Sequence, residues 1–498
     1  MIKASTMKSS AGSSSNLQHW SAARPLYTNT TLLLIGAGML SLAKQLVREY
    51  DHYTIGFSGV SGWSLVLYIV AVWIILTQPV DRFTFPIILT VAIACRLVML
   101  FSDPFLSSDV YRYAWDGVVQ HAHISPYRYV PGDPVLAFLR APNQDLFDHM
   151  NRRDYAHTIY PPAAQFLFYV VTFLNPTVTF MKTAMILFEG LTMYGLVTLL
   201  GELGIRRERS LLYAWCPLLI WELAGSGHLD SVAMAFIVLA LLARYRSQPV
   251  ATGVFLALAI LTKLYPLVLL PVLFRRGEYK MPATVVALGV FAYACYSSVG
   301  LRVFGFLGGY VKEEGMETGS RYFLLELTQH LPGLHSLSSR SYLVVCALVF
   351  TALLLWAWTT CCQTQPASGA SQYTQSGRSK LPMRGGFLVP SSALAFALMI
   401  LFSPHYPWYV AWLVPFLVLV PSLTVFTYVC GLFYLCSTAL AVGSGPLQFR
   451  LNEILYSCVF VAFVIEVVLR RWPLHRVFFT ANVEPHRLVQ SDLKVNPK

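Results

Sequence analysis

Long apolar runs recur along the whole chain, and they constrain its fold more than any other feature of the sequence. A run of roughly 17 to 25 apolar residues can cross a lipid bilayer as a helix. Because 56% of the 498 residues are hydrophobic and only 12% are charged, the sequence predicts an all-α polytopic membrane protein. The candidate membrane-spanning runs lie near residues 30–46, 63–79, 84–101, 177–202, 210–224, 229–245, 281–299, 341–361, 386–402, 407–421, 423–442 and 452–470.

Basic residues gather in short segments between these runs, and they orient the predicted helices. Because cytosolic loops carry an excess of Lys and Arg, we expect five segments in the cytosol: 206–209, 244–246, 275–280, 378–384 and 470–476. The net charge of +12 reflects these segments, so we expect no nucleic-acid partner. Counting crossings places several connections outside the cytosol, namely 102–160, 225–229, 300–340, 403–406 and 443–451.

The chain is expected to form one membrane domain, residues 28–475, between two cytosolic tails. Residues 1–27 are polar and Ser-rich and lack the basic start and apolar stretch of a signal peptide, which predicts a disordered tail. Residues 363–385, rich in Ser, Gly and Gln, are typical of a flexible cytosolic linker, and 476–498 form the second tail. The largest extracytoplasmic loop is predicted at 102–160.

Two segments do not fit simple crossings. The run 161–174 is short and bracketed by prolines, so we expect it to re-enter the membrane or to border a wet cavity. The run 251–274 is interrupted at Lys263 and Pro266, which predicts two shorter helices that meet at an extracytoplasmic kink. An ammonium group at that depth requires water or an anion.

The first large loop begins with a predicted helix on the membrane surface. Ser107 or Ser108 can cap this helix, and Gly117 can end it. Helical spacing places two carboxylates, a guanidinium and a phenol on one face, which suits a sugar and a phosphate. A capping carboxylate beside a surface ion pair would produce the same pattern. The residues on that face are Asp109, Arg112, Tyr113 and Asp116.

Several motifs of the chain resemble one known family. The loop motifs are Asp109-Val110-Tyr111-Arg112-Tyr113, Trp115-Asp116-Gly117, Ser125-Pro126-Tyr127-Arg128-Tyr129 and Thr158-Ile159-Tyr160-Pro161-Pro162. The later motifs are Gly225–Asp230, Leu261–Pro266 and Ser403–Tyr409. Together they resemble polyprenol-phosphate-mannose-dependent bacterial mannosyltransferases, which are membrane glycosyltransferases of the GT-C fold close to the family 87 group.

This resemblance implies a fold, a reaction and a general base. The fold would be a GT-C-like bundle of about 12 transmembrane helices with re-entrant or broken segments, in a bacterial plasma membrane. The reaction would move a hexose, with mannose preferred, from a polyprenyl-phosphate donor to a lipid or glycan acceptor on the extracytoplasmic face. A carboxylate in the first large loop is the base of that fold, and Asp109 matches it. Ser108 stands where many relatives carry a second acid, so the resemblance does not extend to that residue.

The other candidate residues are predicted to bind substrate. Three of them have a second explanation: His228 and Asp230 would also fit a tight turn with a capping carboxylate, and Lys263 would also fit a side chain that reaches the interface. His405 could bind hydroxyls or lie at the interface without a role. The predicted substrate-binding residues are Arg112, Tyr113, Asp116, Tyr127, Arg128, Tyr160, His228, Asp230, Lys263, His405 and Tyr406.

No metal or other cofactor is predicted, because His121 and His123 have no third ligand near them in the sequence. Arg96 lies inside an apolar run and could pair with Glu189 or Glu222. Two other classes of function remain open from the sequence. A membrane transporter or lipid flippase would also carry broken helices and buried charges, and so would an inactive scaffold of the same fold.

Overall fold

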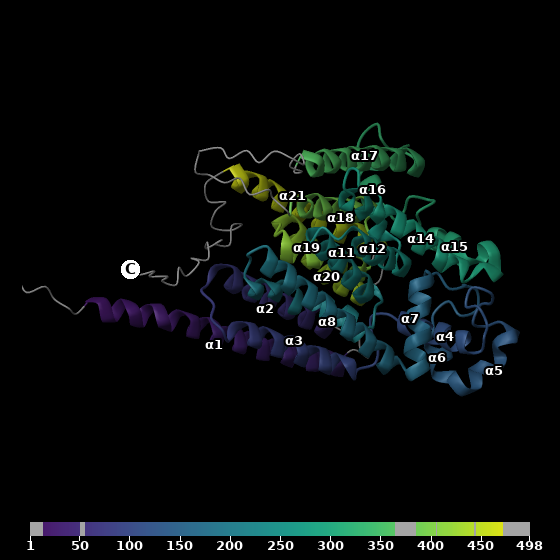
Figure 1. Cartoon of the computed structure of the whole chain (residues 1–498), viewed down its shortest axis with the longest axis horizontal. Helices are drawn as coiled ribbons and strands as arrows, with labels where there is room; N and C mark the ends of the chain where they lie inside the picture. Colours follow the sequence, from purple (N-terminus) through teal and green to yellow (C-terminus); the bar gives the residue numbers. More distant parts are fainter. Residues whose placement is uncertain (1–12, 50–54, 364–384, 405, 443–444, 472–498) are drawn as a thin grey trace, which may run out of the picture.

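We analysed a computed structural model, which describes residues 13–49, 55–363, 385–404, 406–442 and 445–471. These residues form helices joined by turns, and their one bridge of β type is isolated, between Arg275 and Glu278. The predicted all-α architecture is therefore confirmed for this part of the chain (Figure 1).

Among the described residues, five helices are long and apolar enough to cross a membrane, by length and composition. Two bent helix pairs raise the number to seven if each pair is one span: Pro217–Gly225 with Asp230–Tyr245, and Lys280–Ala294 with Ser297–Glu313. Twelve runs were expected, and several of them form shorter apolar helices of 10–17 residues, such as Thr84–Leu100. The five long spans are Pro25–Arg48, Gly59–Thr77, Val178–Glu202, Ser339–Cys361 and Phe449–Leu469.

The α-helices have the following bounds. The first half of the chain contains α1 (Ser13–Glu49), α2 (Ile55–Thr77), α3 (Thr84–Leu100), α4 (Asp109–His121), α5 (Ala137–Arg140), α6 (Gln144–His149), α7 (Pro162–Leu174), α8 (Val178–Glu202), α9 (Leu211–Ala214), α10 (Pro217–Leu219) and α11 (Asp230–Tyr245). The second half contains α12 (Pro249–Thr262), α13 (Leu270–Leu273), α14 (Lys280–Ala294), α15 (Leu307–Glu313), α16 (Phe323–Gln329), α17 (Ser339–Gln363), α18 (Leu388–Phe402), α19 (Val414–Leu419), α20 (Leu423–Val442) and α21 (Gly445–Arg471).

Short turns of 3₁₀-helix and one π-helix connect these elements. The π-helix is η4 (Ile220–Gly225). The 3₁₀-helices are η1 (Pro134–Leu136), η2 (Ala141–Asn143), η3 (Arg207–Ser210), η5 (Tyr265–Leu269), η6 (Ser297–Phe304) and η7 (Pro407–Leu413).

The structure describes part of the predicted N-terminal tail but little of the predicted linker and none of the predicted C-terminal tail. Helix α1 begins at Ser13 and therefore starts inside the segment 1–27 that was expected to be a disordered tail. The linker prediction, 363–385, and the tail prediction, 476–498, fall largely or wholly on residues outside the described ranges.

Helix α11 lies at the centre of the fold. Almost all of its side chains are buried, and it packs against α8 and α12. Arg96 of α3 forms an ion pair with Glu189 of α8 at 2.8 Å, and its Nη1 also donates to the carbonyl of Ala214 at 2.8 Å. The internal pair expected for Arg96 is therefore confirmed, with Glu189 as its partner.

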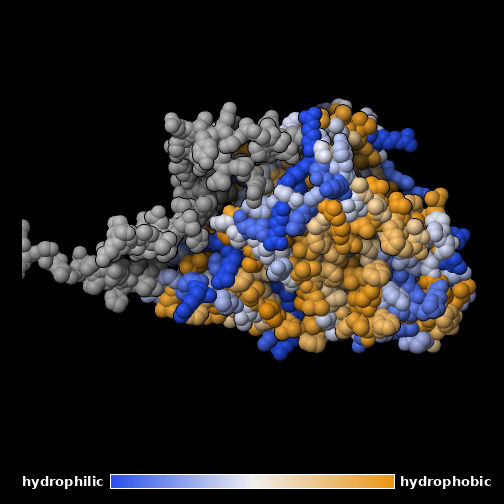
Figure 2. Space-filling view, in the orientation of Figure 1, coloured by the Kyte–Doolittle hydropathy of each residue, from blue (hydrophilic) through white to orange (hydrophobic). Residues whose placement is uncertain are grey.

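Much of the outer surface is apolar. Figure 2 shows broad hydrophobic areas on the visible face, separated by smaller hydrophilic patches. Side chains such as Leu187, Phe291 and Leu348 are more than 60% exposed. A water-soluble protein rarely exposes apolar patches of this extent, so this surface suits contact with lipid.

The molecule has two distinct ends. At one end, Arg246 pairs with Glu202 at 2.5 Å, and the guanidinium of Arg275 donates to the carbonyl of Arg244 at 3.2 Å. These residues lie in or beside the basic segments that follow α8, α11 and α13. At the other end, α11 begins at Asp230. Because 16 helical residues span about 24 Å, the basic cluster and the start of α11 are separated by nearly the thickness of a bilayer core.

The segment between α3 and α8 forms a lobe at the second end, where α4 to α7 lie together (Figure 1). Helix α4 begins at Asp109 as expected, but it continues past Gly117 to His121. The prediction that Gly117 ends this helix is wrong for a packing reason. A Cβ atom at Gly117 would overlap Thr172 and lie 2.6 Å from the carbonyl oxygen of Phe168, so glycine allows α4 to pack closely on α7.

A second loop reaches the same lobe. It contains η6 and α15, joined by Gly305, whose φ of 55° is the left-handed conformation that favours glycine. A Cβ atom at Gly305 would overlap the carbonyl oxygen of Thr158. The backbones of the two loops are therefore in direct contact at this point.

Candidate active site

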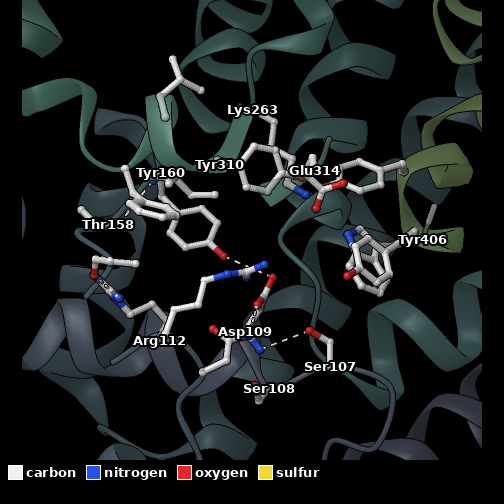
Figure 3. Close-up of a pocket in the computed structure, with 18 of the residues that line it drawn as sticks. Ser107, Ser108, Asp109, Arg112, Thr158, Tyr160, Lys263, Tyr310, Glu314 and Tyr406 are labelled. Carbon is white, nitrogen blue, oxygen red and sulfur yellow. Dashed lines mark hydrogen bonds between the residues drawn. The ribbon is translucent and has the colours of Figure 1, made fainter. Parts of the chain in front are cut away.

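A cavity of about 700 Å³ opens between the loops at this end of the molecule (Figure 3). Its volume lies within the range of roughly 300 to 1,000 Å³ that is usual for small-molecule sites. Most of its walls belong to connections that the sequence analysis placed on one side of the membrane. The lining residues fall in segments 104–112, 151–161, 262–265, 306–314 and 406–409.

Asp109 is the first residue of α4, and its carboxylate borders the cavity. Its backbone N–H donates to Ser107 Oγ at 3.2 Å, which fixes the start of the helix. One carboxylate oxygen accepts from Asn151 Nδ2 at 3.1 Å, and the other accepts from the Tyr160 hydroxyl at 3.3 Å. Asp109 is thus oriented by two neutral donors, and a helix N-terminus stabilises its negative charge.

Tyr160 supports Asp109 as a hydrogen-bond donor. Burial raises the pKa of its hydroxyl well above the ordinary value, and the nearby carboxylate of Asp109 raises this pKa further. The hydroxyl therefore keeps its proton at neutral pH and donates to Asp109. The backbone carbonyl of Tyr160 accepts from the hydroxyl of Tyr127 at 2.7 Å, so Tyr127 holds Tyr160 from behind.

Arg152 is a cation on the cavity wall that the sequence analysis missed. Its Nε donates to Glu313 Oε2 at 2.7 Å, which links the first loop to the end of α15. Burial lowers the pKa of this guanidinium, but Glu313 and Asp109 raise it by more, so the pKa lies above its ordinary value. Arg152 therefore places a permanent positive charge near Asp109.

Lys263 also borders the cavity, at the break predicted between two short helices. Helix α12 ends at Thr262, and the backbone of Lys263 is extended, which confirms the interruption. The ammonium donates to Asp230 Oδ2 at 2.6 Å, while the Tyr265 hydroxyl donates to Asp230 Oδ1 at 3.3 Å. The sequence singled out Lys263 and Asp230 separately, and the structure brings them together as an ion pair.

Stacked rings form another wall. The rings of Tyr406 and Trp408 are 4.5 Å apart and nearly parallel, at 10°. His228 stacks on Trp408 at 4.3 Å from behind the wall, and its Nε2 lies 3.3 Å from a carboxylate oxygen of Glu222. His228 is buried and does not border the cavity. In this position it supports the ring of Trp408.

Arg112 borders the cavity, and the buried Asp116 holds it in place. Arg112 Nε donates to Asp116 Oδ1 at 2.8 Å, and its Nη1 donates to the carbonyl of Ala156 at 3.1 Å. The second oxygen of Asp116 accepts from Gln165 Nε2 at 2.9 Å. Asp116 therefore positions Arg112 from outside the cavity.

Two further predicted residues, Tyr113 and Arg128, do not line the cavity. Tyr113 is fully buried and stacks on Phe168 at 4.8 Å. Arg128 is exposed on the lobe and is absent from the cavity lining. His405 lies outside the described residues. Of the predicted set, Asp109, Arg112, Tyr160, Lys263 and Tyr406 line the cavity.

His157 is a further lining residue that had no predicted role. Its Nδ1 is buried without a hydrogen-bond partner among the described residues. Burial lowers the pKa of its imidazole, and the charges of Arg112 and Arg302 lower it further, so the ring is neutral at pH 7. A neutral imidazole offers a hydrogen bond to a hydroxyl group.

The described residues contain no group of three or more His, Cys, Asp or Glu side chains that could hold a metal ion. The cavity instead combines carboxylates, paired cations and aromatic rings. Carboxylates and rings bind sugar hydroxyls and sugar faces, whereas Arg and Lys bind phosphate. This arrangement fits the transfer of a sugar from a phosphate-activated donor.

Comparison with known proteins gives the same class of function. Residues 28–275, about half of the chain, match the family model of the alpha-(1->6)-mannopyranosyltransferase N-terminal domain. This region contains Asp109, Arg152, Tyr160 and Lys263 and ends before Glu314. No curated protein and no solved structure matches the chain. The family match, together with the composition of the cavity, shows that the chain belongs to the alpha-(1->6)-mannopyranosyltransferase family and is a membrane glycosyltransferase.

Proposed function

We propose that this mannosyltransferase uses a polyprenyl-phosphate mannose donor and transfers the sugar to a hydroxyl of a lipid-linked or glycan acceptor. The carrying observation is the placement of Asp109 in a cavity whose other walls hold paired cations and stacked rings. Asp109 accepts the proton of the acceptor hydroxyl, and that oxygen attacks the anomeric carbon. The lipid phosphate leaves from the opposite side with the bonding electrons.

This displacement needs only one catalytic carboxylate. A phosphate is a stable anion and requires cations rather than a protonated acid as it departs. Lys263 and Arg152 are the candidate cations, and both are held in the wall by acidic partners. Because a single displacement inverts the anomeric centre, an α-linked product requires a β-linked donor.

The ammonium of Lys263 gives a direct test of the donor. Replacing Lys263 alone would leave the buried carboxylate of Asp230 without its cation, so we propose the double variant Lys263→Met/Asp230→Asn. We expect the KM for the donor to rise about tenfold to a hundredfold, the range for a lost charged hydrogen bond, with the KM for the acceptor unchanged. Steady-state kinetics with each substrate varied in turn measures both constants.

The control is an ion pair of similar chemistry at the opposite end of the molecule. Arg246→Met/Glu202→Gln removes the pair at the basic end and should leave both KM values at the wild-type level. If the Lys263/Asp230 variant also keeps its wild-type KM for the donor, Lys263 has a structural role and another group binds the phosphate.

The extracytoplasmic position of the cavity is part of the same proposal. Nucleotide sugars are made in the cytosol, so a site on the other face calls for a lipid-linked donor. Helix α11 begins near the cavity at Asp230 and ends in the basic segment 244–246. Lys and Arg favour the cytosolic side of a membrane. The cavity would then face outside the cytosol.

Cysteine labelling of intact cells tests this orientation. In a cysteine-free background, we expect a membrane-impermeant thiol reagent to label Ala137→Cys and Ser336→Cys, two exposed positions at the cavity end. Gln248→Cys, which is exposed at the basic end, should react only after the cells are opened. Labelling of Gln248→Cys alone in intact cells would reverse the orientation and remove the argument for a lipid-linked donor.

A further inference from the structure

A second carboxylate borders the cavity, and it comes from the loop that the family match does not reach. Glu314 follows α15 directly and is only 5% exposed. It forms an ion pair with Arg321, which is equally buried, and the Nε of Arg321 donates to the carbonyl of Phe402 at 3.3 Å. The carboxylate is therefore held by Arg321, which is itself fixed to the end of α18.

One oxygen of Glu314 remains available to a ligand. Arg321 binds Oε2, whereas Oε1 has no hydrogen-bond partner among the described residues and is not sealed from the cavity. A buried carboxylate oxygen that faces a cavity costs free energy unless a donor reaches it. Sugar hydroxyls are donors of the right size and geometry for this position.

The surroundings of Glu314 are also suited to a sugar ring. The hydroxyls of Tyr310 and Tyr409 bond to each other, and the ring of Tyr409 lies 5.7 Å from the ammonium of Lys263 and 5.6 Å from the guanidinium of Arg321. Aromatic faces bind the apolar face of a pyranose. Figure 3 shows Glu314 beside Tyr310 and Lys263, on the far side of the pocket from Asp109 and Ser108.

This placement separates the roles of the two carboxylates. Among the described residues, the hydrogen bonds that the carboxylate of Asp109 accepts come from two neutral donors, so it can take a proton from the acceptor hydroxyl. Figure 3 places Glu314 on the same side of the pocket as Lys263, one of the two cations proposed for the donor phosphate, and one of its oxygens is already occupied by Arg321. A phosphate bound by Lys263 would bring the transferred sugar within reach of Glu314, while the attacking hydroxyl approaches from the side of Asp109.

We propose that Glu314 binds a hydroxyl of the transferred sugar ring and helps to select mannose among the hexoses. This inference rests on the proposed function, because it takes the ligand to be a mannosyl phosphate. A site built to bind a hydroxyl discriminates strongly against an analogue that lacks it, since its own polar groups are then left unpaired. Glu314 is therefore a determinant of sugar specificity.

The test combines Glu314→Gln with donors that lack single hydroxyls. Polyprenyl-phosphate mannose and its 2-, 3-, 4- and 6-deoxy analogues are compared in wild type and variant. We expect Glu314→Gln to lower kcat/KM for the full donor about tenfold to a hundredfold. Removing one hydroxyl from the donor also lowers kcat/KM. For one deoxy donor, the loss caused by Glu314→Gln and the loss caused by the missing hydroxyl should not multiply, because the carboxylate and that hydroxyl belong to the same contact. Multiplying losses for all four analogues would overturn the proposal.

Two further variants separate binding from folding. Glu317→Gln makes the same chemical change at an exposed residue of the same loop and should match wild type. Glu314→Gln could unfold the loop by leaving the buried guanidinium of Arg321 without a negative partner, so Glu314→Gln/Arg321→Met removes both charges. If this double variant folds and still discriminates fully among the deoxy donors, Glu314 is only structural.

A binding measurement separates this inference from the proposed function. Calorimetry with β-mannosyl phosphate reports the affinity of the cavity for the sugar without any transfer step. Suppose that the wild type transfers no sugar from the lipid donor, but that Glu314→Gln lowers the affinity for β-mannosyl phosphate more than the affinity for one of its deoxy analogues. The proposed reaction is then wrong, and the inference stands. Equal affinities in wild type and variant would contradict the inference.

Discussion

Asp109→Asn is expected to lower kcat about a hundredfold to ten-thousandfold, the range for loss of a positioned general base. Asparagine has the size of aspartate and still accepts from one of the two donors, Asn151 or Tyr160. It cannot take a proton from the acceptor hydroxyl. The variant should therefore fold, insert and bind donor with a nearly normal affinity, and single-turnover kinetics should show that the chemical step alone is slow.

Two other aspartates of the same loop serve as comparisons. Asp103 is exposed and outside the cavity, so Asp103→Asn should keep its activity. Asp116→Asn weakens the buried contact with Arg112, so it should lower the stability of the protein more than its turnover. Near-normal turnover of Asp109→Asn in folded protein would show that another group is the base.

The second large effect is expected at the contact between the two loops. Gly305→Ala places a methyl group where the carbonyl oxygen of Thr158 lies, so α15 and the first loop must separate. Tyr310 and Glu314 follow on this loop and line the cavity. Because displacements of about 1 Å at a catalytic site cost about a hundredfold, we expect kcat/KM to fall by about that factor.

The matched control is Gly300→Ala in the same loop. Gly300 has φ 56° and ψ −136°, and Gly305 has φ 55° and ψ −134°, so alanine meets the same backbone strain at both positions. A Cβ atom at Gly300 meets nothing within 4 Å. The strain shared by both variants costs about 1–3 kcal/mol of stability, and only Gly305→Ala should lose activity. Equal activities of the two variants would show that the loops do not need this contact.

The local structure around the first loop was largely predictable from the sequence. A carboxylate directly after two serines is typical of a helix start, and α4 begins at Asp109. A lysine followed by a proline three residues later predicted the break in 251–274, and α12 ends at Thr262. Both patterns act through a few neighbouring residues, so they need no knowledge of the tertiary fold.

The existence of charge pairs was predictable, but the exact partner of each charge was not, because the partners are far apart in the sequence. Lys263 pairs with Asp230, and Arg96 pairs with Glu189 across two different helices. Each charge signals that a partner must exist, since an unpaired charge at such a site is costly. Only the packing of the helices shows which partner is near.

The second loop carries no motif that distinguishes it in the sequence, and its role was missed for that reason. Glu313 and Glu314 resemble an ordinary surface pair until the fold places them against Arg152 and Arg321. Gly305 could have hinted at a close approach, but the same loop contains other glycines, such as Gly300, at which a Cβ atom would meet nothing within 4 Å. The cavity therefore depends on contacts between segments more than 100 residues apart, such as that between Arg152 and Glu313.

The alternatives left open by the sequence are narrowed by the structure and the family. The ionisable side chains that line the cavity gather at one end of the molecule, whereas a transporter usually carries its binding groups near the membrane midplane. The family to which the chain belongs is one of glycosyltransferases. Transport is therefore no longer needed to explain the broken helices and buried charges.

The most direct test of the proposed reaction is a transfer assay with purified protein in liposomes. The donor is β-linked polyprenyl-phosphate mannose, the acceptor is an α-mannoside, and GDP-mannose serves as the competing donor. We expect release of polyprenyl phosphate together with an α-linked product, in equal amounts, and no transfer from GDP-mannose. Transfer from GDP-mannose with no use of the lipid donor, or retention of the β-configuration in the product, would contradict the proposed reaction.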